Sequence, residues 1–259
     1  MLKVLIGLFS IGLVLNLNAG SYDYTTGGDQ YSVDELRDQC TAKKLGDACQ
    51  PYAKSLLKMR DENPNITAQE KRVLLIGAYT AVDAGCQRYT FPSENSCELK
   101  KTLFTNDDNK YDLDTIPKRI EFLEEACSYK AGYVCADLGH IYRDGIENNI
   151  AKDLKKAKNF YNLAAKYGVS NAYHYIDLLT VNAMPEGIQK KKKSLELSEI
   201  SCSKRSSEAC LLHGALIGES NPRQMIQYIN KACELGNNKA CSLSQNLIVA
   251  YAMRGIKLY

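Results

Sequence analysis

The sequence predicts an all-α fold: a right-handed α/α solenoid of about five to six helical hairpins, stapled by disulfides. Three observations predict it. Cysteine pairs recur along the 259-residue chain, and apolar residues recur at the three- and four-residue steps of helices. No segment alternates apolar and polar residues clearly enough to predict a strand.

The repeat is defined by pairs of key positions, most of them cysteines. The first positions of successive units are 40, 86, 127, 165, 202 and 233, with spacings of 46, 41, 38, 37 and 31 residues. One unit carries Ala165 and Tyr173 in place of the cysteine pair. A period of thirty-odd residues is typical of stacked helical hairpins.

Each unit contains the pattern of two helices. Residues 136–145 and 153–168 show the clearest helical periodicity, and Gly145 and Gly168 lie where these helices should end. A hydroxyl residue followed three positions later by Glu predicts a capping box at two helix starts. These are Ser32 with Glu35 and Thr67 with Glu70.

The first residues resemble a secretory leader. Lys3 precedes an apolar stretch of about fourteen residues, and small residues follow at 19–21. The stretch is shorter than the roughly 20 residues that span a bilayer, although an uncleaved anchor is the alternative. We expect a signal peptide at 1–20, a flexible mature N-terminus at 21–31, the solenoid at 32–254 and a tail at 255–259.

The net charge and the distribution of apolar residues after the leader restrict the compartment of the protein and the class of its partner. The formal charge is only +3, from 33 Lys and Arg against 30 Asp and Glu, so a concentrated nucleic-acid footprint is not expected. No later segment is long and apolar enough to span a membrane after signal cleavage. The sequence predicts an exported protein, periplasmic or secreted.

An even set of ten cysteines in an exported chain predicts disulfides. Each first cysteine should end one helix and each second cysteine should begin the next, within the roughly 4.4–6.8 Å between Cα atoms that a disulfide needs. The spacing suits neither zinc nor a C-x-x-C redox centre, so no metal and no cofactor is expected, with catalytic or metal roles as the minor alternative. The predicted pairs are Cys40–Cys49, Cys86–Cys97, Cys127–Cys135, Cys202–Cys210 and Cys233–Cys241.

Residues 136–145, ADLGHIYRDG, and the following DLKKAKNFYNLAA resemble the Sel1-like repeat, a relative of the tetratricopeptide repeat. With a leader and a C-x7-C pair per unit, the chain is similar to the Helicobacter cysteine-rich proteins. The match is in register over residues 32–250 and close over 120–170. The resemblance implies a second function, penicillin binding with slow β-lactamase activity, and a β-lactam or peptidoglycan-like ligand.

Serine motifs test this enzymatic alternative. Ser55 and Lys58 have the S-x-x-K form in which a lysine activates a hydroxyl, but Ser201 and Lys204 fit it too, as expected by chance. The K-T-G motif is missing, because Leu103 follows the Lys-Thr pair. We expect Ser55 to be a polar residue on a helix surface and assign no catalytic residue.

Three further features have more than one interpretation. His140 and His174 should point within about 40° of each other on successive helices, whereas His213 should face elsewhere. The histidines would then form a shared binding face or a weak metal site, and the alternative is that they are unrelated. The acidic residues 106–114 suit a solvated insertion better than a calcium loop. Lys190 to Lys193 form either a solvated helix face or a site for an acidic partner or anionic lipid.

The predicted function is non-enzymatic: a scaffold that binds a protein or peptide partner on its concave face, with an assembly chaperone as a third possibility. In such solenoids the first helix of each hairpin lines the concave face. The candidate contacts on these helices are Tyr52, Lys54, Asp137, His140, Arg143, His174, Asp177, His213 and Gln245.

Overall fold

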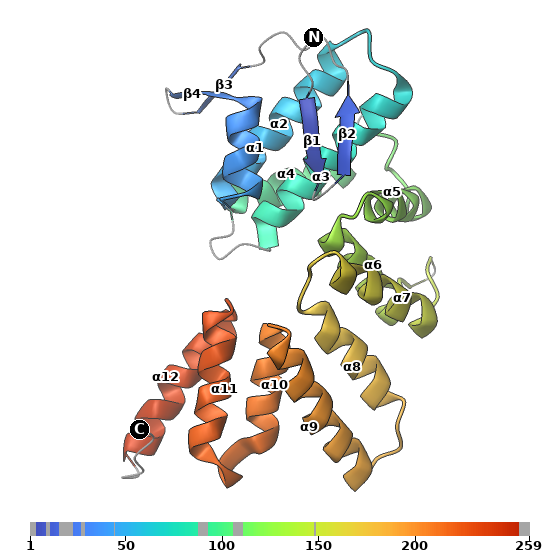
Figure 1. Ribbon diagram of the computed structural model, residues 1–259. Helices are drawn as coiled ribbons and strands as arrows, with labels where there is room; N and C mark the ends of the chain where they lie inside the picture. Colours follow the sequence, from blue (N-terminus) through green and yellow to red (C-terminus); the bar gives the residue numbers. More distant parts are fainter. Residues whose placement is uncertain are drawn as a thin grey trace. The chain divides into compact units, whose positions relative to one another are not determined.

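The computed structural model describes residues 4–8, 11–15, 23–26, 29–43, 45–87, 93–105, 111–147 and 149–253. These residues form twelve α-helices, one 3-10 helix and four short strands (Figure 1). The chain divides into two compact units, Met1–Leu138 and Gly139–Tyr259. The predicted all-α solenoid of stapled hairpins is confirmed.

The four strands were not predicted. They pair as two antiparallel hairpins, in segments where the sequence predicts the leader and the mature N-terminus, and those boundaries stay predictions. The first hairpin is rich in Val, Ile and Leu, and β-branched residues favour extended backbone. The strands are β1 (Val4–Leu8), β2 (Ile11–Leu15), β3 (Asp23–Thr26) and β4 (Asp29–Ser32).

The first unit is built on helices whose starts are marked in the sequence. Ser32 and Glu35 form the predicted capping box, with the Ser32 amide donating to the Glu35 carboxylate at 2.7 Å. Thr67 and Glu70 make the same reciprocal pair. The helices are α1 (Val33–Thr41), α2 (Gly46–Glu62), α3 (Ala68–Gln87), α4 (Glu94–Thr105), α5 (Ile116–Ser128) and the first part of α6 (Gly132–Asp144).

The second unit continues the hairpins from the end of α6. Gly145 and Gly168 follow the ends of α6 and α7 with φ of 75° and 91°, which confirms both predicted stops. Helices α8 and α10 contact each other, so the first helices of successive hairpins form one layer. The elements are α7 (Leu154–Lys166), α8 (Ala172–Asn182), α9 (Ile188–Ser203), α10 (Ser207–Ile217), the 3-10 helix η1 (Gly218–Ser220), α11 (Pro222–Glu234) and α12 (Asn238–Met253).

All ten cysteines are paired as predicted, with Cα–Cα distances of 4.5–4.9 Å. Each disulfide joins the last turns of one helix to the first turns of the next, as Cys202 on α9 and Cys210 on α10 show. The α7–α8 turn has Ala165 and Tyr173 at these positions instead. Five disulfides indicate an oxidising, exported location.

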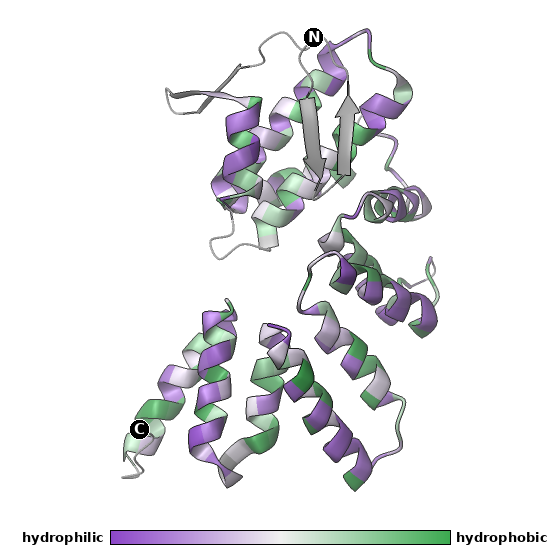
Figure 2. Ribbon diagram, in the orientation of Figure 1, coloured by the Kyte–Doolittle hydropathy of each residue, from purple (hydrophilic) through white to green (hydrophobic). Residues whose placement is uncertain are grey.

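Hydrophilic and hydrophobic residues are mixed along the helices of both units (Figure 2). In the part of the chain that the structure describes, no helix combines the length and the apolar character needed to cross a membrane. The apolar residues instead build cores between neighbouring helices, such as the one that Met225, Ile226 and Ile229 form around the Cys202–Cys210 disulfide.

Candidate functional site

Three of the predicted contact residues gather around two tyrosines in the second unit. We call His140, Arg143, Tyr161, His174 and Tyr175 the aromatic cluster. His140 and Arg143 come from α6, Tyr161 from α7, and His174 and Tyr175 from α8. The first helices of two successive hairpins therefore contribute to one site, with a second helix between them.

Ring contacts and one hydrogen bond hold the aromatic cluster together. The Nδ1 atom of His140 shares a hydrogen bond with the Tyr161 hydroxyl at 2.9 Å. The His140 ring meets Tyr175 edge-on with centroids 4.4 Å apart, and Tyr161 stacks on Tyr175 at 5.2 Å. The ring of His174 lies 5.6 Å from that of Tyr175. Tyr175 thus touches every ring of the site.

The absence of a side chain at Gly139 allows the Tyr161 ring to pack close to α6. A Cβ atom on Gly139 would lie 2.4 Å from the Tyr161 ring, closer than any real contact. Because the glycine leaves this space, the Tyr161 ring packs against the α6 backbone and is fully buried, with 0% exposure. The Leu-Gly element of the repeat motif therefore has a packing role: it brings the Tyr161 hydroxyl within reach of His140.

The electrostatics of the cluster keep it close to neutral. The Arg143 guanidinium makes two hydrogen bonds to Asp144, at 2.8 and 2.6 Å, which lowers the pKa of that carboxyl. Burial raises the pKa of Tyr161, and the nearby Arg143 opposes this shift. Burial also lowers the pKa of His174 to about 4, so its ring is uncharged at neutral pH.

The Nδ1 atom of His174 is buried and has no hydrogen-bond partner among the described residues. The aromatic faces and the Arg143 guanidinium offer stacking and hydrogen bonding to a ligand. The cluster holds no activated nucleophile, and no group of three metal-ligating side chains occurs among the described residues.

The other candidates in the second unit lie apart from the cluster. Asp177 accepts a hydrogen bond from the Ser201 hydroxyl at 2.5 Å and ties α8 to α9, and burial raises its pKa. His213 is buried, with Nδ1 3.0 Å from the Ser198 hydroxyl and its ring 4.3 Å from that of Tyr228. Gln245 is exposed on α12.

Three candidates belong to the first unit. Tyr52 is buried inside α2, and burial raises its pKa to about 12. Lys54 is exposed on the same helix. Asp137 lies 3.8 Å from the Nζ of Lys100, which also pairs with the buried Asp83. Because Tyr52 and His213 are buried, they do not enter the binding surface proposed below.

Both S-x-x-K serines are buried. Ser55 is only 3% exposed and donates its hydroxyl hydrogen bond to the Pro51 carbonyl at 3.0 Å. Lys58 points to Glu62 at 3.9 Å instead. The expectation that Ser55 lies on a helix surface is wrong, because α2 packs between α1 and α3 and leaves little of its circumference free. The second motif serine, Ser201, is bonded to Asp177 as described above.

Two charged segments also have definite partners. Asp112 and Asp114 both bind Lys118, at 2.6 and 2.9 Å, while residues 106–110 of the predicted acidic insertion lie outside the described residues. The lysine run opens α9 as expected, and its first and last members pair with acids. Lys190 binds Glu186 at 2.6 Å, and Lys193 binds Glu196 at 2.9 Å.

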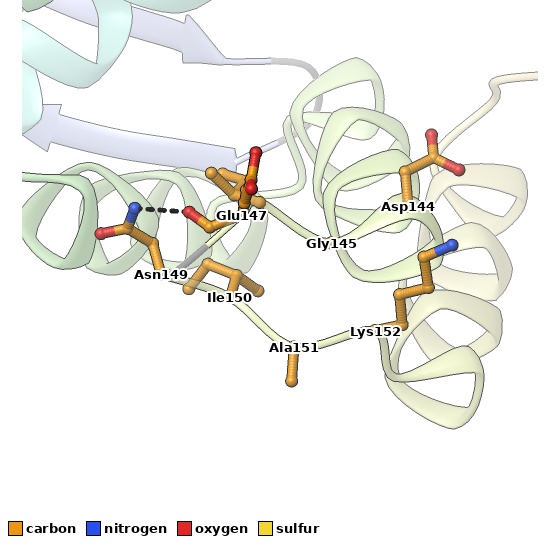
Figure 3. Close-up of a pocket in the computed structure, with 8 residues that line it drawn as sticks. Asp144, Gly145, Glu147, Asn149, Ile150, Ala151 and Lys152 are labelled. Atoms are coloured by element: carbon orange, nitrogen blue, oxygen red, sulfur yellow. Dashed lines mark hydrogen bonds between the residues drawn. The ribbon is translucent and has the colours of Figure 1, made fainter.

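A hollow of about 520 Å³ lies in the loop between α6 and α7 (Figure 3). Its polar lining comes from Asp144, Glu147, Asn149 and Lys152, and the Asn149 amide donates to the Glu147 carbonyl at 2.9 Å. The lining comes from the end of α6 and the loop that follows it, and it carries charges of both signs. No motif in the sequence indicated this hollow, because the loop closes through backbone hydrogen bonds between Ile146 and Ile150.

Two tyrosines of the aromatic cluster were not among the predicted contact residues. Tyr161 and Tyr175 both contact His140. The available signal was the small Gly139 one position before His140. A glycine inside a helix marks a place where another side chain approaches closely.

Solved structures similar to this chain are Sel1 repeat proteins. One is c5321, a protective antigen of uropathogenic Escherichia coli strains that has an SLR fold. It is 16% identical to this chain with a TM-score of 0.46, and the match covers 88% of this chain and 45% of that chain. The other is a Sel1 repeat protein from Oxalobacter formigenes, which is 17% identical with a TM-score of 0.46. That match covers 80% of this chain and 86% of the other chain. The chain thus spans about half the length of the first. No protein-family model and no curated protein matches the sequence. These similarities carry no functional assignment, and the likeness to the Helicobacter proteins stays a prediction.

Proposed function

We propose that the chain is an exported binding protein, periplasmic or secreted, that holds a protein or peptide partner on the layer formed by its first helices. The observation that carries the proposal is the aromatic cluster, where α6 and α8 present half-buried His140, Arg143, His174 and Tyr175 side by side. The concave inner face of the solenoid is the expected location.

The chemistry of the cluster supports this role. Tyr and Arg are the side chains that contribute most per residue at protein interfaces, and Tyr loses little conformational entropy on binding. Here Tyr175 is already held between two rings, and Arg143 is held by Asp144. A partner therefore meets side chains that are in place before binding, which reduces the entropic cost of association.

The partner that fits best has aromatic or apolar side chains and a hydrogen-bond donor or acceptor for the His174 ring. The cluster carries little net charge, because Arg143 is neutralised by Asp144 and His174 is uncharged at neutral pH. Hydrolysis of β-lactams rests on the resemblance alone, since both S-x-x-K serines are buried: Ser55 is 3% exposed and Ser201 is 2% exposed.

Site-specific crosslinking in the producing cells tests the proposal. Replacement of Tyr175 by photoreactive p-benzoylphenylalanine is expected to give one discrete crosslinked product. The same replacement at Tyr167, a half-buried tyrosine at the end of α7, is the matched control and is expected to give none.

Arg143→Ala in the Tyr175 crosslinking variant should lower the yield of the product by at least about tenfold if the interface is centred on the cluster. Equal products from both positions, or an undiminished yield after Arg143→Ala, would contradict the proposed surface. Absence of any product from Tyr175 would contradict it as well.

A further inference from the structure

The charge of the chain is unevenly divided between its two units. The unit Gly139–Tyr259 contains 17 Lys and Arg and 10 Asp and Glu, a net charge of +7. The unit Met1–Leu138 contains 16 and 20, a net charge of −4. A partner of the second unit that is attracted by charge is therefore anionic.

Part of this positive charge lies on the second helices α7 and α9, which are largely hydrophilic in Figure 2. Helix α7 contains four lysines and no acidic residue, and the first six residues of α9 contain another four lysines. On α9, Lys191 and Lys192 are exposed and make no ion pair with any described residue. No acidic side chain in the first turn offsets the positive end of the α9 dipole, so these lysines repel it and one another.

Aliphatic side chains lie beside these lysines. Ile188 is 83% exposed and Leu195 is 38% exposed. Together with Lys191 and Lys192 they occupy positions i, i+3, i+4 and i+7 of one helix, which places all four on one side. We call these four residues the α9 face. An isoleucine exposed to this degree, next to unpaired lysines, has no role in the packing of the unit.

We propose that the α9 face docks the protein on an anionic phospholipid surface. Ile188 and Leu195 would enter the boundary between headgroups and acyl chains, while Lys191 and Lys192 bind phosphate oxygens. Lysine stems lie along apolar material and keep their ammonium groups in the polar layer, so both residue types fit one surface. An acidic polypeptide satisfies the lysines but gives no reason for the exposed Ile188.

This surface is separate from the aromatic cluster. It lies on a second helix, whereas the cluster is presented mainly by first helices. Docking through the α9 face would hold the protein at a membrane surface and leave the first-helix layer free for its partner. The two proposals can therefore fail independently.

Flotation of the purified, oxidised full chain with lipid vesicles tests the inference. The protein is expected to float with vesicles of phosphatidylcholine and phosphatidylglycerol, and to stay behind with vesicles of phosphatidylcholine alone. Lys191→Glu with Lys192→Glu should weaken vesicle binding by about tenfold or more. The control, Lys231→Glu with Lys239→Glu, changes the net charge equally at exposed positions of α11 and α12 and should retain binding.

A second pair of variants tests the apolar contribution. Ile188→Ser is expected to weaken binding severalfold, whereas Met253→Ser, at a residue 81% exposed on α12, should not. Circular dichroism melting of every variant shows that the fold is kept. Equal losses in both charge variants would overturn the inference, as would absence of binding to the anionic vesicles. Full competition by soluble polyglutamate, with Ile188→Ser unaffected, would overturn it in favour of an acidic polypeptide.

Discussion

At the scale of single residues, Gly139 decides how closely α7 packs on α6. The Tyr161 ring occupies the space where a side chain on this residue would begin. An alanine would gain about 1 kcal/mol of helix propensity, but overpacking a filled core costs about 1–3 kcal/mol. The balance at this position therefore depends on whether the ring can move, and its complete burial leaves it little room.

We expect Gly139→Ala to lower the free energy of unfolding by about 1–2 kcal/mol, because the ring of Tyr161 has no free space into which it can shift. Urea unfolding followed by circular dichroism measures the change. The double variant with Tyr161→Leu should show a smaller additional loss than the two single changes predict. An unchanged or higher unfolding midpoint for Gly139→Ala would contradict this packing argument.

His174 should make stability depend on pH. Its pKa is about 4 in the folded chain and near 6.5 in a free histidine, so the unfolded chain binds more protons between these values. Stability is therefore complete above about pH 6.5 and falls as the pH decreases towards 4, by roughly 1–3 kcal/mol for a half-buried ring. His174→Asn should remove this part of the decline. The prediction fails if unfolding midpoints measured from pH 7 to pH 4 fall equally in both proteins.

At the scale of secondary-structure elements, the turns between successive hairpins carry the covalent links. Five of these turns are closed by a disulfide, while the α7–α8 turn has Ala165 and Tyr173 in the corresponding positions. Contacts in a solenoid are mostly between neighbouring elements, so each helix pair depends on its own interface. A disulfide across the turn limits the conformations of the unfolded chain between the two helices that it joins.

Replacement of Cys202 and Cys210 by alanine should lower the free energy of unfolding by about 2–3 kcal/mol, since the pair closes a short loop. Both sulfurs are buried in the core around Ile229, so the loss of packing adds to the effect. Urea unfolding without reductant measures it, with Ser203→Ala on the neighbouring exposed position as the control. Equal stability of the double variant and the control would show that this link contributes nothing.

At the scale of the whole molecule, helix starts, helix ends and disulfide pairs were predictable, because each is set by residues close in the sequence. The Ser32 and Glu35 cap involves groups three positions apart, and the disulfide between Cys127 and Cys135 spans the turn between two consecutive helices. The burial of Ser55 and Tyr52 was not predictable in the same way. Both belong to an amphipathic α2, and only the packing of α1 and α3 on either side shows which of its residues remain exposed.

The candidate site was predictable in part for the same reason. Helical periodicity placed His140 and His174 on similar sides of successive first helices, but it carried no information about Tyr161, which reaches them from the intervening helix. Likewise, the lysine run at Lys190 to Lys193 was visible in the sequence, whereas the division into paired and unpaired lysines depends on where Glu186 and Glu196 lie.

The sequence by itself determined the helical hairpins, their period and the partner of every cysteine, because local hydrogen bonding, helical periodicity and short loops act between residues near one another in the chain. Only the tertiary structure decided that the space left at Gly139 is filled by Tyr161, that His174 loses its charge and that Ile188 stays exposed. Those outcomes depend on which helices pack against each other, because contacts between residues far apart in the sequence decide which side chains are shielded from water.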